Sequence, residues 1–255
     1  ARRAKAAGLA LVSFTDHDSM EGAEEKRAAA EEYGLLSVSG WEVSAYSEAG
    51  KVHVLGYGCK PCKAYEEFLK ARKAGGFIRA EDSLKKANSC FSLALTMADI
   101  EREHTVKETP LHTMHVVRAF AKALGMDAGK VYLGYFAKGK AAYSGLCRPT
   151  PEEAIDVVHG CGGIAVLAHP GRICGAGSGR EALMEELVAR GLDGIECTYT
   201  THTAEETEYF RAYAAKRGLL ETGGSDFHEE GRGRTIGLPA FVPSERLLGA
   251  LGLRF

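Results

Sequence analysis

The sequence predicts a mixed α/β fold interrupted by a helical segment. Strand-like and helix-like patterns alternate through residues 1–62 and again through residues 149–255, whereas residues 63–148 carry helical patterns with almost no strand signal. Alternating strands and helices with short connections are typical of a parallel α/β sheet or barrel. We therefore predict one barrel domain built from residues 1–62 and 149–255, with residues 63–148 inserted as a helical subdomain.

The first segment contains three strand patterns separated by one helical pattern. Apolar and β-branched runs predict strands at residues 8–14, 35–44 and 51–58. Residues 21–34 predict a helix, and Gly34 at its end suits a C-terminal cap. Asp18 precedes this helix and could cap its N-terminus.

The inserted segment is predicted to be helical throughout. Apolar residues spaced three and four apart indicate amphipathic helices. They occur at residues 64–75, 80–89, 94–104, 111–125 and 127–139.

The alternation of helices and strands resumes at residue 150. Thr150, Pro151 and Glu153 form a capping-box pattern, with proline at the first helical position, and so predict a helix start. The same reasoning predicts strands at 163–170, 194–199 and 219–228, and helices at 180–191 and 204–218.

The composition is that of an ordinary globular protein without a strong overall charge. The 255 residues are 45% hydrophobic and 26% charged, with a net charge of −2, so we expect no stable binding of duplex nucleic acid. No stretch reaches the roughly 18 apolar residues of a membrane span, and we predict no membrane partner. A metal site could still attract a small phosphorylated ligand, because bound cations supply their own positive charge.

Seven cysteines are scattered along the chain, an odd number that argues for a reducing compartment rather than a disulfide framework. We therefore expect a cytoplasmic protein. Cys59 and Cys62 form a C-x-x-C pattern, but the sequence shows neither a second ligand pair for zinc nor a thioredoxin-like unit. A purely structural role is the favoured interpretation of this pair.

Ionisable side chains gather at the predicted strands. They include Asp16-His17-Asp18, Glu42, His53, His169, Glu196, and Asp226 with His228. Each has an ordinary explanation, such as a helix cap, a surface acid or a buried histidine. In parallel α/β folds, however, the carboxyl ends of the strands share one face, so these side chains can converge.

Carboxylates and imidazoles together suit divalent metals such as Zn²⁺, Mn²⁺ or Fe²⁺. Such ions lower the pKa of bound water and stabilise charge on a phosphoryl group. Nucleophilic triads fit less well, because no G-x-S-x-G pattern is present.

The series of motifs resembles the PHP (polymerase and histidinol phosphatase) superfamily, and within it the stand-alone nucleotide phosphatases and exoribonucleases. The matching residues are Thr15-Asp16-His17-Asp18, Gly40-Trp41-Glu42, His53-Val54-Leu55-Gly56, Ala168-His169-Pro170-Gly171 and Gly224-Ser225-Asp226-Phe227-His228. The resemblance spans nearly the whole chain. It implies a distorted seven-stranded (β/α) barrel, a trinuclear metal centre and a helical insertion.

The resemblance also implies roles for individual residues. The implied metal ligands are His17 together with His228, Glu42 as a bridge between two ions, His53 and His169 on one of those ions, and Asp226. The implied substrate-binding residues are His115, His202 and Arg172. Thr113-Met114 stands where the family often has Arg-Pro ahead of the histidine, which puts a phosphate-binding arginine in doubt.

One departure from the family pattern lies ahead of Thr15. Family members begin with a strand ending in His-x-His, followed by Ser-Asp-Gly, and neither motif occurs in the residues before Thr15. We expect that this N-terminal strand is missing from the chain. The competing explanation is a degenerate domain that truly lacks these ligands.

The function implied is metal-dependent hydrolysis of a phosphate monoester of a nucleotide, such as a 3′,5′-bisphosphate nucleotide, or of a short oligonucleotide. Metal-activated water would carry it out, with two to three divalent ions (Mn²⁺, Zn²⁺ or Fe²⁺) as cofactors. One alternative is a non-catalytic module that binds metal or a phosphate ligand. Another is hydrolysis of a C–N bond, which the absence of a lysine at a strand end beside these ligands disfavours.

Overall fold

The computed structural model describes residues 1–105, 109–173, 178–231 and 233–253, which form two compact units. The α/β unit comprises Ala1–Tyr65 together with the described residues from Pro149 onward. The helical unit comprises the described residues of Glu66–Arg148. Among the described residues, no helix combines the length and the apolar composition needed to cross a membrane.

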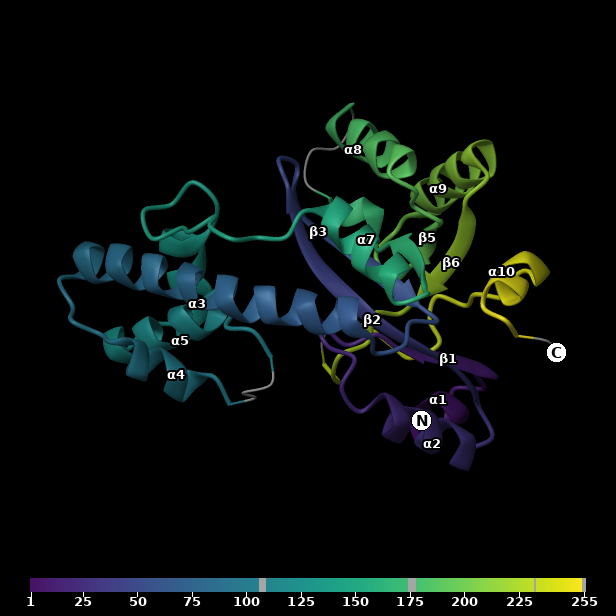
Figure 1. The fold of residues 1–255 in the computed structure, drawn as a ribbon, viewed down its shortest axis with the longest axis horizontal. Helices are drawn as coiled ribbons and strands as arrows, with labels where there is room; N and C mark the ends of the chain where they lie inside the picture. The colour runs from purple at the N-terminus through teal and green to yellow at the C-terminus, as the bar shows by residue number, and fades with distance from the viewer. Residues whose placement is uncertain (106–108, 174–177, 232, 254–255) are drawn as a thin grey trace. The chain divides into compact units, whose positions relative to one another are not determined.

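A curled six-stranded sheet forms the centre of the α/β unit (Figure 1), and its strands follow one another in chain order. The strands are β1 (Leu11–Phe14), β2 (Leu36–Ser47), β3 (Gly50–Tyr57), β4 (Ile164–Leu167), β5 (Gly194–Tyr199) and β6 (Leu220–Gly224). The mixed α/β fold predicted from the sequence is confirmed.

The sheet is mixed rather than wholly parallel. β1 pairs parallel with β2, and β4, β5 and β6 pair parallel with one another, but β3 runs antiparallel to both β2 and β4. The reason is local: β2 ends at Ser47 and β3 begins at Gly50. A connection this short can only form a hairpin, because a parallel pair requires a long crossover.

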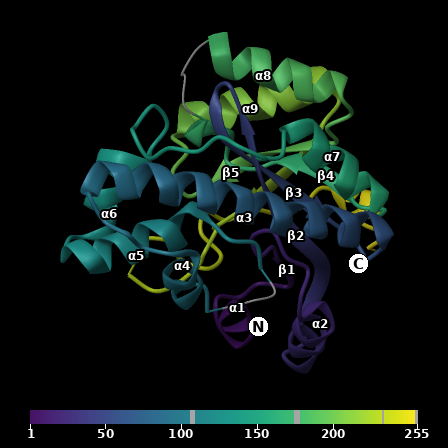
Figure 2. The ribbon, with the colours of Figure 1, turned by 60° about the vertical axis from the view of Figure 1, so that its left-hand side comes forward.

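Helices cover the sheet of the α/β unit. They are α1 (Arg2–Ala6), α2 (Ala23–Glu32), α7 (Pro151–Gly160), α8 (Ser178–Ala189), α9 (Ala204–Arg217) and α10 (Glu245–Ala250), with a 3₁₀ turn η2 (Pro170–Arg172) after β4. α8 and α9 lie side by side (Figures 1 and 2), and Tyr213 of α9 donates a hydrogen bond to Glu185 of α8 at 2.8 Å. The capping box predicted at Thr150 is present, with Glu153 as its partner.

Large apolar side chains from neighbouring strands fill the core of this unit. Trp41, Val43, Leu167 and Ile195 are all completely buried. The Trp41 ring also meets Tyr65 edge-on, with 5.3 Å between ring centroids. These contacts fix the strands whose polar residues are described below.

The helical unit contains α4 (Met97–Glu103), α5 (Thr113–Leu124), α6 (Ala128–Val131) and the π-helical turn η1 (Tyr132–Phe136), together with most of α3 (Lys63–Phe91). Figure 2 shows α3 running past α4 and α5. The core of the helical unit is apolar, with Ile100, Val116, Phe120 and Phe136 almost fully buried.

α3 is one continuous helix of 29 residues, where the sequence pattern predicted two separate helices. The predicted break falls at Gly75-Gly76, and both glycines are needed for close packing rather than for a turn. A Cβ on Gly76 would lie 2.7 Å from the carbonyl oxygen of Leu111, and one on Gly75 would lie 2.8 Å from Cys147 Cβ. The glycines therefore let the backbone pass close to its neighbours while the helix continues.

Candidate metal centre

Strand pairing brings three predicted ligands onto one face of the sheet. Glu42 lies inside β2 and pairs with Leu55, while Ser44, two residues further along β2 and therefore on the same face, pairs with His53 across the β2–β3 hairpin. Beyond the end of β1, His17 forms a parallel bridge with Glu42. Paired residues on adjacent strands project to the same face, so His17 and Glu42 meet although 25 positions separate them in the sequence.

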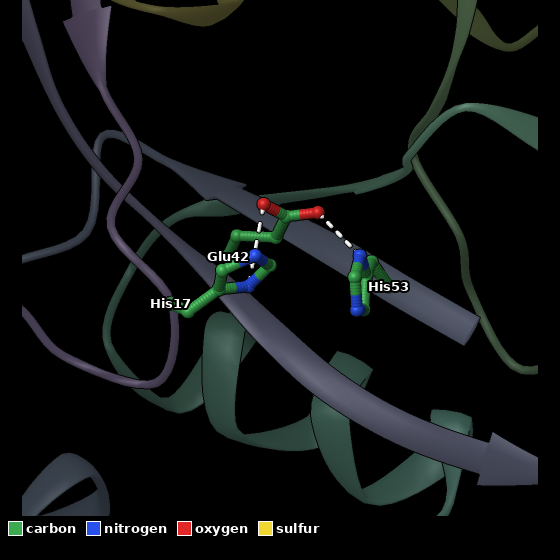
Figure 3. A group of neighbouring side chains, drawn as sticks. All are labelled: His17, Glu42 and His53. Carbon is green, nitrogen blue, oxygen red and sulfur yellow. Dashed lines mark ion pairs between the residues drawn. The ribbon is translucent and has the colours of Figure 1, made fainter. Parts of the chain in front are cut away.

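The Glu42 carboxylate stands between imidazole rings (Figure 3). Its Oε2 atom is 3.4 Å from His17 Nδ1, and its Oε1 atom is 2.6 Å from His53 Nδ1. The Oε1 atom is also 3.0 Å from His169 Nε2. One buried carboxylate on β2 therefore contacts histidines from β3, from beyond the end of β1 and from beyond the end of β4.

Burial and these contacts determine the charge of the group. Burial alone would raise the pKa of Glu42, but hydrogen bonds from His169 and His53 outweigh it and hold the pKa well below its ordinary value. Burial lowers the pKa of His53 to about 4, although Glu42 partly opposes that shift. At neutral pH the pair therefore consists of an ionised carboxylate and a neutral imidazole, which are the forms that bind metals.

The residues fit a divalent cation. His17, Glu42 and His53 each offer one ligand atom, and these atoms all lie within 4.8 Å of one another. His17 Nδ1 and His53 Nε2 are buried without a hydrogen-bond partner among the residues that the structure describes. A buried nitrogen without a partner is costly unless something else satisfies it, and a metal ion would do so.

His228 extends this cluster toward Asp226. The His17 and His228 rings lie 5.5 Å apart between centroids, and their binding of one metal ion stays a prediction. Asp226 follows β6 and is engaged by two other groups. Tyr199 donates a hydrogen bond to its Oδ2 at 3.0 Å, and Arg234 Nη1 lies 2.6 Å from the same oxygen.

The turn after β4 holds His169 in an uncommon backbone conformation. Its φ angle is +31°, in the left-handed region that non-glycine residues rarely adopt. Its backbone amide donates to Glu196 Oε2 at 2.7 Å. Burial raises the pKa of Glu196 to about 8. A buried acid on β5 thus helps to fix His169 after the end of β4.

The predicted substrate-binding residues differ in their surroundings. Both ring nitrogens of His202 contact backbone groups: Nδ1 lies 2.9 Å from the Cys197 carbonyl oxygen, and Nε2 accepts from the Gly171 amide at 3.1 Å. These bonds favour a role in holding the turn after His169. Arg172 is half-exposed and donates to the Tyr199 hydroxyl at 3.3 Å. Their contact with substrate stays a prediction.

His115 belongs to the helical unit, in the first turn of α5. Its Nδ1 atom accepts a hydrogen bond from the His112 backbone amide at 3.0 Å, and its ring lies 4.7 Å from that of His104 between centroids. Its proposed contact with a substrate phosphate likewise stays a prediction.

Sequence reasoning missed several groups that support this site. Asp18 does not cap α2, whose N-cap is Gly22. It is buried instead, and its Oδ1 accepts from the Ser44 backbone amide at 2.8 Å, which ties the residues after β1 to β2. Arg234 and Tyr199, the partners of Asp226, carried no signal, because their role depends on a contact between segments distant in the sequence.

Similarity to characterised proteins agrees with this geometry. The chain is 33% identical over 252 residues to a 3′,5′-nucleoside bisphosphate phosphatase from Chromobacterium violaceum, covering 94% of this chain and 85% of that protein. The chain belongs to the PHP superfamily. It is a metal-dependent phosphoesterase, as predicted from the motifs.

Further relatives match most of this PHP chain. A 5′-3′ exoribonuclease from Haemophilus influenzae is 29% identical over 232 residues, covering 89% of this chain and 82% of that protein. A solved structure from Chromobacterium violaceum, described as an amidohydrolase with bound sulfate, matches with a TM-score of 0.75 and 30% identity, covering 91% of this chain and 82% of that one. No protein-family model matches the chain.

Proposed function

We propose that this PHP chain hydrolyses a phosphate monoester of a nucleotide, such as a 3′,5′-bisphosphate nucleotide, or of a short oligonucleotide. The observation that carries the proposal is the Glu42 carboxylate held between His17, His53 and His169, with two buried imidazole nitrogens left for a metal. The bisphosphate phosphatase and exoribonuclease relatives supply the substrate class.

The residues that would hold two to three divalent ions, Mn²⁺, Zn²⁺ or Fe²⁺, are His17, Glu42, His53, His169, Asp226 and His228. Bound there, the ions would supply activation of water and neutralisation of charge on the phosphoryl group. Glu42 suits a bridging role, because its two oxygens face different histidines.

The chain's own residues prepare this chemistry in two ways. Glu42 is already ionised and His53 is already neutral near pH 7, so neither must lose a proton to bind a cation. Arg172 and Arg234 both contact the Tyr199 hydroxyl, at 3.3 Å and 2.9 Å. Arg172 is the more exposed of the two and is the better placed to bind a substrate phosphate, with His115 and His202 as further candidates.

We place the protein in the cytoplasm. An odd number of cysteines scattered along the chain favours a reducing compartment over a disulfide framework. The near-neutral charge favours a small substrate over duplex nucleic acid.

Phosphate release tests the proposal directly. Purified full-length protein, loaded separately with Mn²⁺, Zn²⁺ or Fe²⁺, should release phosphate from a panel of nucleotide monophosphates and bisphosphates. His17→Ala should abolish most of that release, whereas Asp16→Asn, which alters the exposed acid next to it, should not. If the loaded protein binds metal but releases no phosphate, the non-catalytic alternative replaces the proposal.

Hydrolysis of a C–N bond is the second candidate, because a solved structure of similar fold is described as an amidohydrolase. A panel of amides assayed with the same metal-loaded protein separates the two. Turnover of an amide without turnover of any phosphate ester would favour this second function.

A further inference from the structure

Two cysteine sulfurs lie close together in the α/β unit, and only one of the two cysteines belongs to the C-x-x-C pattern. Cys62 Sγ lies 3.1 Å from Cys161 Sγ. This distance is longer than the roughly 2.05 Å of a disulfide bond, so the two sulfurs are not joined by a disulfide. The second cysteine of the C-x-x-C pattern therefore has a thiol neighbour 99 positions away, which the sequence could not show.

Both cysteines lie at helix ends. Cys62 directly precedes Lys63, the first residue of α3, and Cys161 is the C-cap residue of α7. Backbone N–H groups at the start of a helix stabilise an anionic thiolate. The Cys62 thiol also donates to the Gly160 carbonyl oxygen at 3.5 Å, which holds it beside the end of α7.

The two thiols differ in access to solvent. Cys62 is partly exposed, whereas Cys161 is only 6% exposed. Burial, together with the neighbouring Cys62 thiol, raises the pKa of Cys161 to about 12. Cys62 is therefore the thiol that a dissolved reagent reaches first, and Cys161 stays protonated beside it.

Cys59, the other member of the C-x-x-C pattern, is a packing residue. It is completely buried, and its thiol donates to the Val158 carbonyl oxygen at 3.8 Å. A Cβ on Gly56 would lie 2.9 Å from Cys59 Sγ, and one on Gly163 would overlap it, so both glycines leave room for this sulfur. A sulfur enclosed in this way has little freedom to turn toward Cys62.

We propose that Cys62 and Cys161 form an oxidative modification site, at which a small-molecule disulfide of the glutathione type converts the two thiols into a reversible disulfide. The site is separate from the metal ligands and does not rest on the proposed phosphoesterase substrate.

The reaction proceeds by two exchanges. The Cys62 thiolate attacks one sulfur of oxidised glutathione, forming a mixed disulfide and releasing one glutathione thiolate. Cys161 then gives its proton to water and attacks Cys62 Sγ as the thiolate, forming the Cys62–Cys161 bond and releasing the second glutathione thiolate, which takes up a proton from water. The protein loses two electrons and two protons, and one oxidised glutathione becomes two reduced molecules.

The bond would connect the chain on both sides of the helical unit. Residues 66–148 all lie between Cys62 and Cys161 in the sequence. Closing so long a loop restricts the unfolded chain and stabilises the folded one in the chain-entropy description of disulfides. Oxidation should therefore raise the thermal unfolding midpoint.

The test uses full-length protein equilibrated in glutathione buffers, followed by alkylation and non-reducing peptide mapping by mass spectrometry. The expected product is a cross-linked peptide pair joining Cys62 to Cys161, with two thiols fewer per chain and a higher thermal midpoint. A reductant should reverse all three changes. Cys62→Ser, at the partly exposed position, should abolish them, whereas Cys90→Ser, at an exposed thiol of the helical unit, should leave them intact.

Two results would overturn the proposal. One is a lasting glutathione adduct on Cys62 while Cys161 remains open to alkylation after denaturation. The other is a Cys59–Cys62 cross-link in place of the Cys62–Cys161 pair. Cys59→Ala separates these outcomes, because it removes the competing bond and should leave the Cys62–Cys161 bond unchanged.

Discussion

The two units of this protein bury charged and polar side chains in opposite ways. In the α/β unit, Glu42, His53 and His169 are buried against one another. In the helical unit, the buried guanidinium of Arg79 faces backbone carbonyl oxygens, donating to Leu146 at 3.2 Å and to Cys147 at 3.1 Å.

The difference separates a functional cluster from a structural one. Arg79 satisfies carbonyl groups that would otherwise lack partners, and its own donors are used in doing so. In the cluster around Glu42, by contrast, His17 Nδ1 and His53 Nε2 have no hydrogen-bond partners among the described residues. In this pair of clusters, the incomplete hydrogen bonds of His17 and His53 fit a cation site, whereas the contacts of Arg79 fit a structural tie.

The largest effect is expected from Glu42→Gln in the α/β unit. Replacing the ionised carboxylate removes the group that links the histidines, so we expect phosphoesterase activity to fall by more than about 100-fold, since changes outside the ligand shell already cost about 10- to 100-fold. Metal content by elemental analysis and phosphate release measure the two effects. Asp16→Asn is the matched control, because Asp16 is exposed and pairs with Lys26.

Activity within a few-fold of wild type in Glu42→Gln, with metal content unchanged, would contradict this assignment of Glu42.

Arg79→Met tests the structural side of the comparison. Loss of the guanidinium leaves buried carbonyl groups unpaired, so the free energy of unfolding should fall by about 2 kcal/mol. Urea denaturation measures this change. Metal content of the folded variant should stay at the wild-type level, and a selective loss of metal would show that the two kinds of cluster are not separable.

Glu196 offers a pH-dependent test, because its pKa is raised from 4.5 to about 8 by burial. The folded protein therefore holds a proton on Glu196 that the unfolded chain releases above about pH 4.5, and stability falls as pH rises from there toward 8. Glu196→Gln removes this penalty. In EDTA, the variant should gain more than about 1 kcal/mol relative to wild type between pH 5 and pH 8.

Urea denaturation of the wild type and of Glu196→Gln at pH 5 and pH 8 measures this difference in the free energy of unfolding. An equal pH dependence in the variant and in the wild type would mean that Glu196 keeps its ordinary acidity. Arg79→Met should leave the pH dependence as it is in wild type, since Arg79 does not titrate in this range.

The smallest effects are expected from glycines in helices. Gly249 in α10 has open space around it, and Gly249→Ala should stabilise by up to about 1 kcal/mol through helix propensity. Gly76→Ala in α3 should instead destabilise, because the new methyl group would meet the Leu111 carbonyl oxygen at 2.7 Å. Thermal denaturation of both variants shows whether each substitution raises or lowers the unfolding midpoint. A higher midpoint for Gly76→Ala would mean that the close contact with Leu111 does not explain the glycine at position 76.

The sequence alone predicted a good part of the candidate site. It named His17, Glu42 and His53 as ligands, and the structure brings these three side chains together. Strand ends recognised from short patterns indicated that these residues could converge, and the resemblance to the PHP motifs implied their roles as ligands. The metal-ligand roles of these three, and the roles of His169, Asp226, His228, Arg172, His115 and His202, stay predictions.

What the sequence determined by itself were features fixed within a few residues, such as the capping box at Thr150 and the alternation of strands and helices. Only the tertiary structure decided that α3 continues through Gly75-Gly76, that Asp18 holds β2 rather than a helix, and that Cys62 lies beside Cys161. Each of these depends on a contact between distant segments. Such contacts depend on the packing of the whole unit, and a local sequence pattern does not predict them.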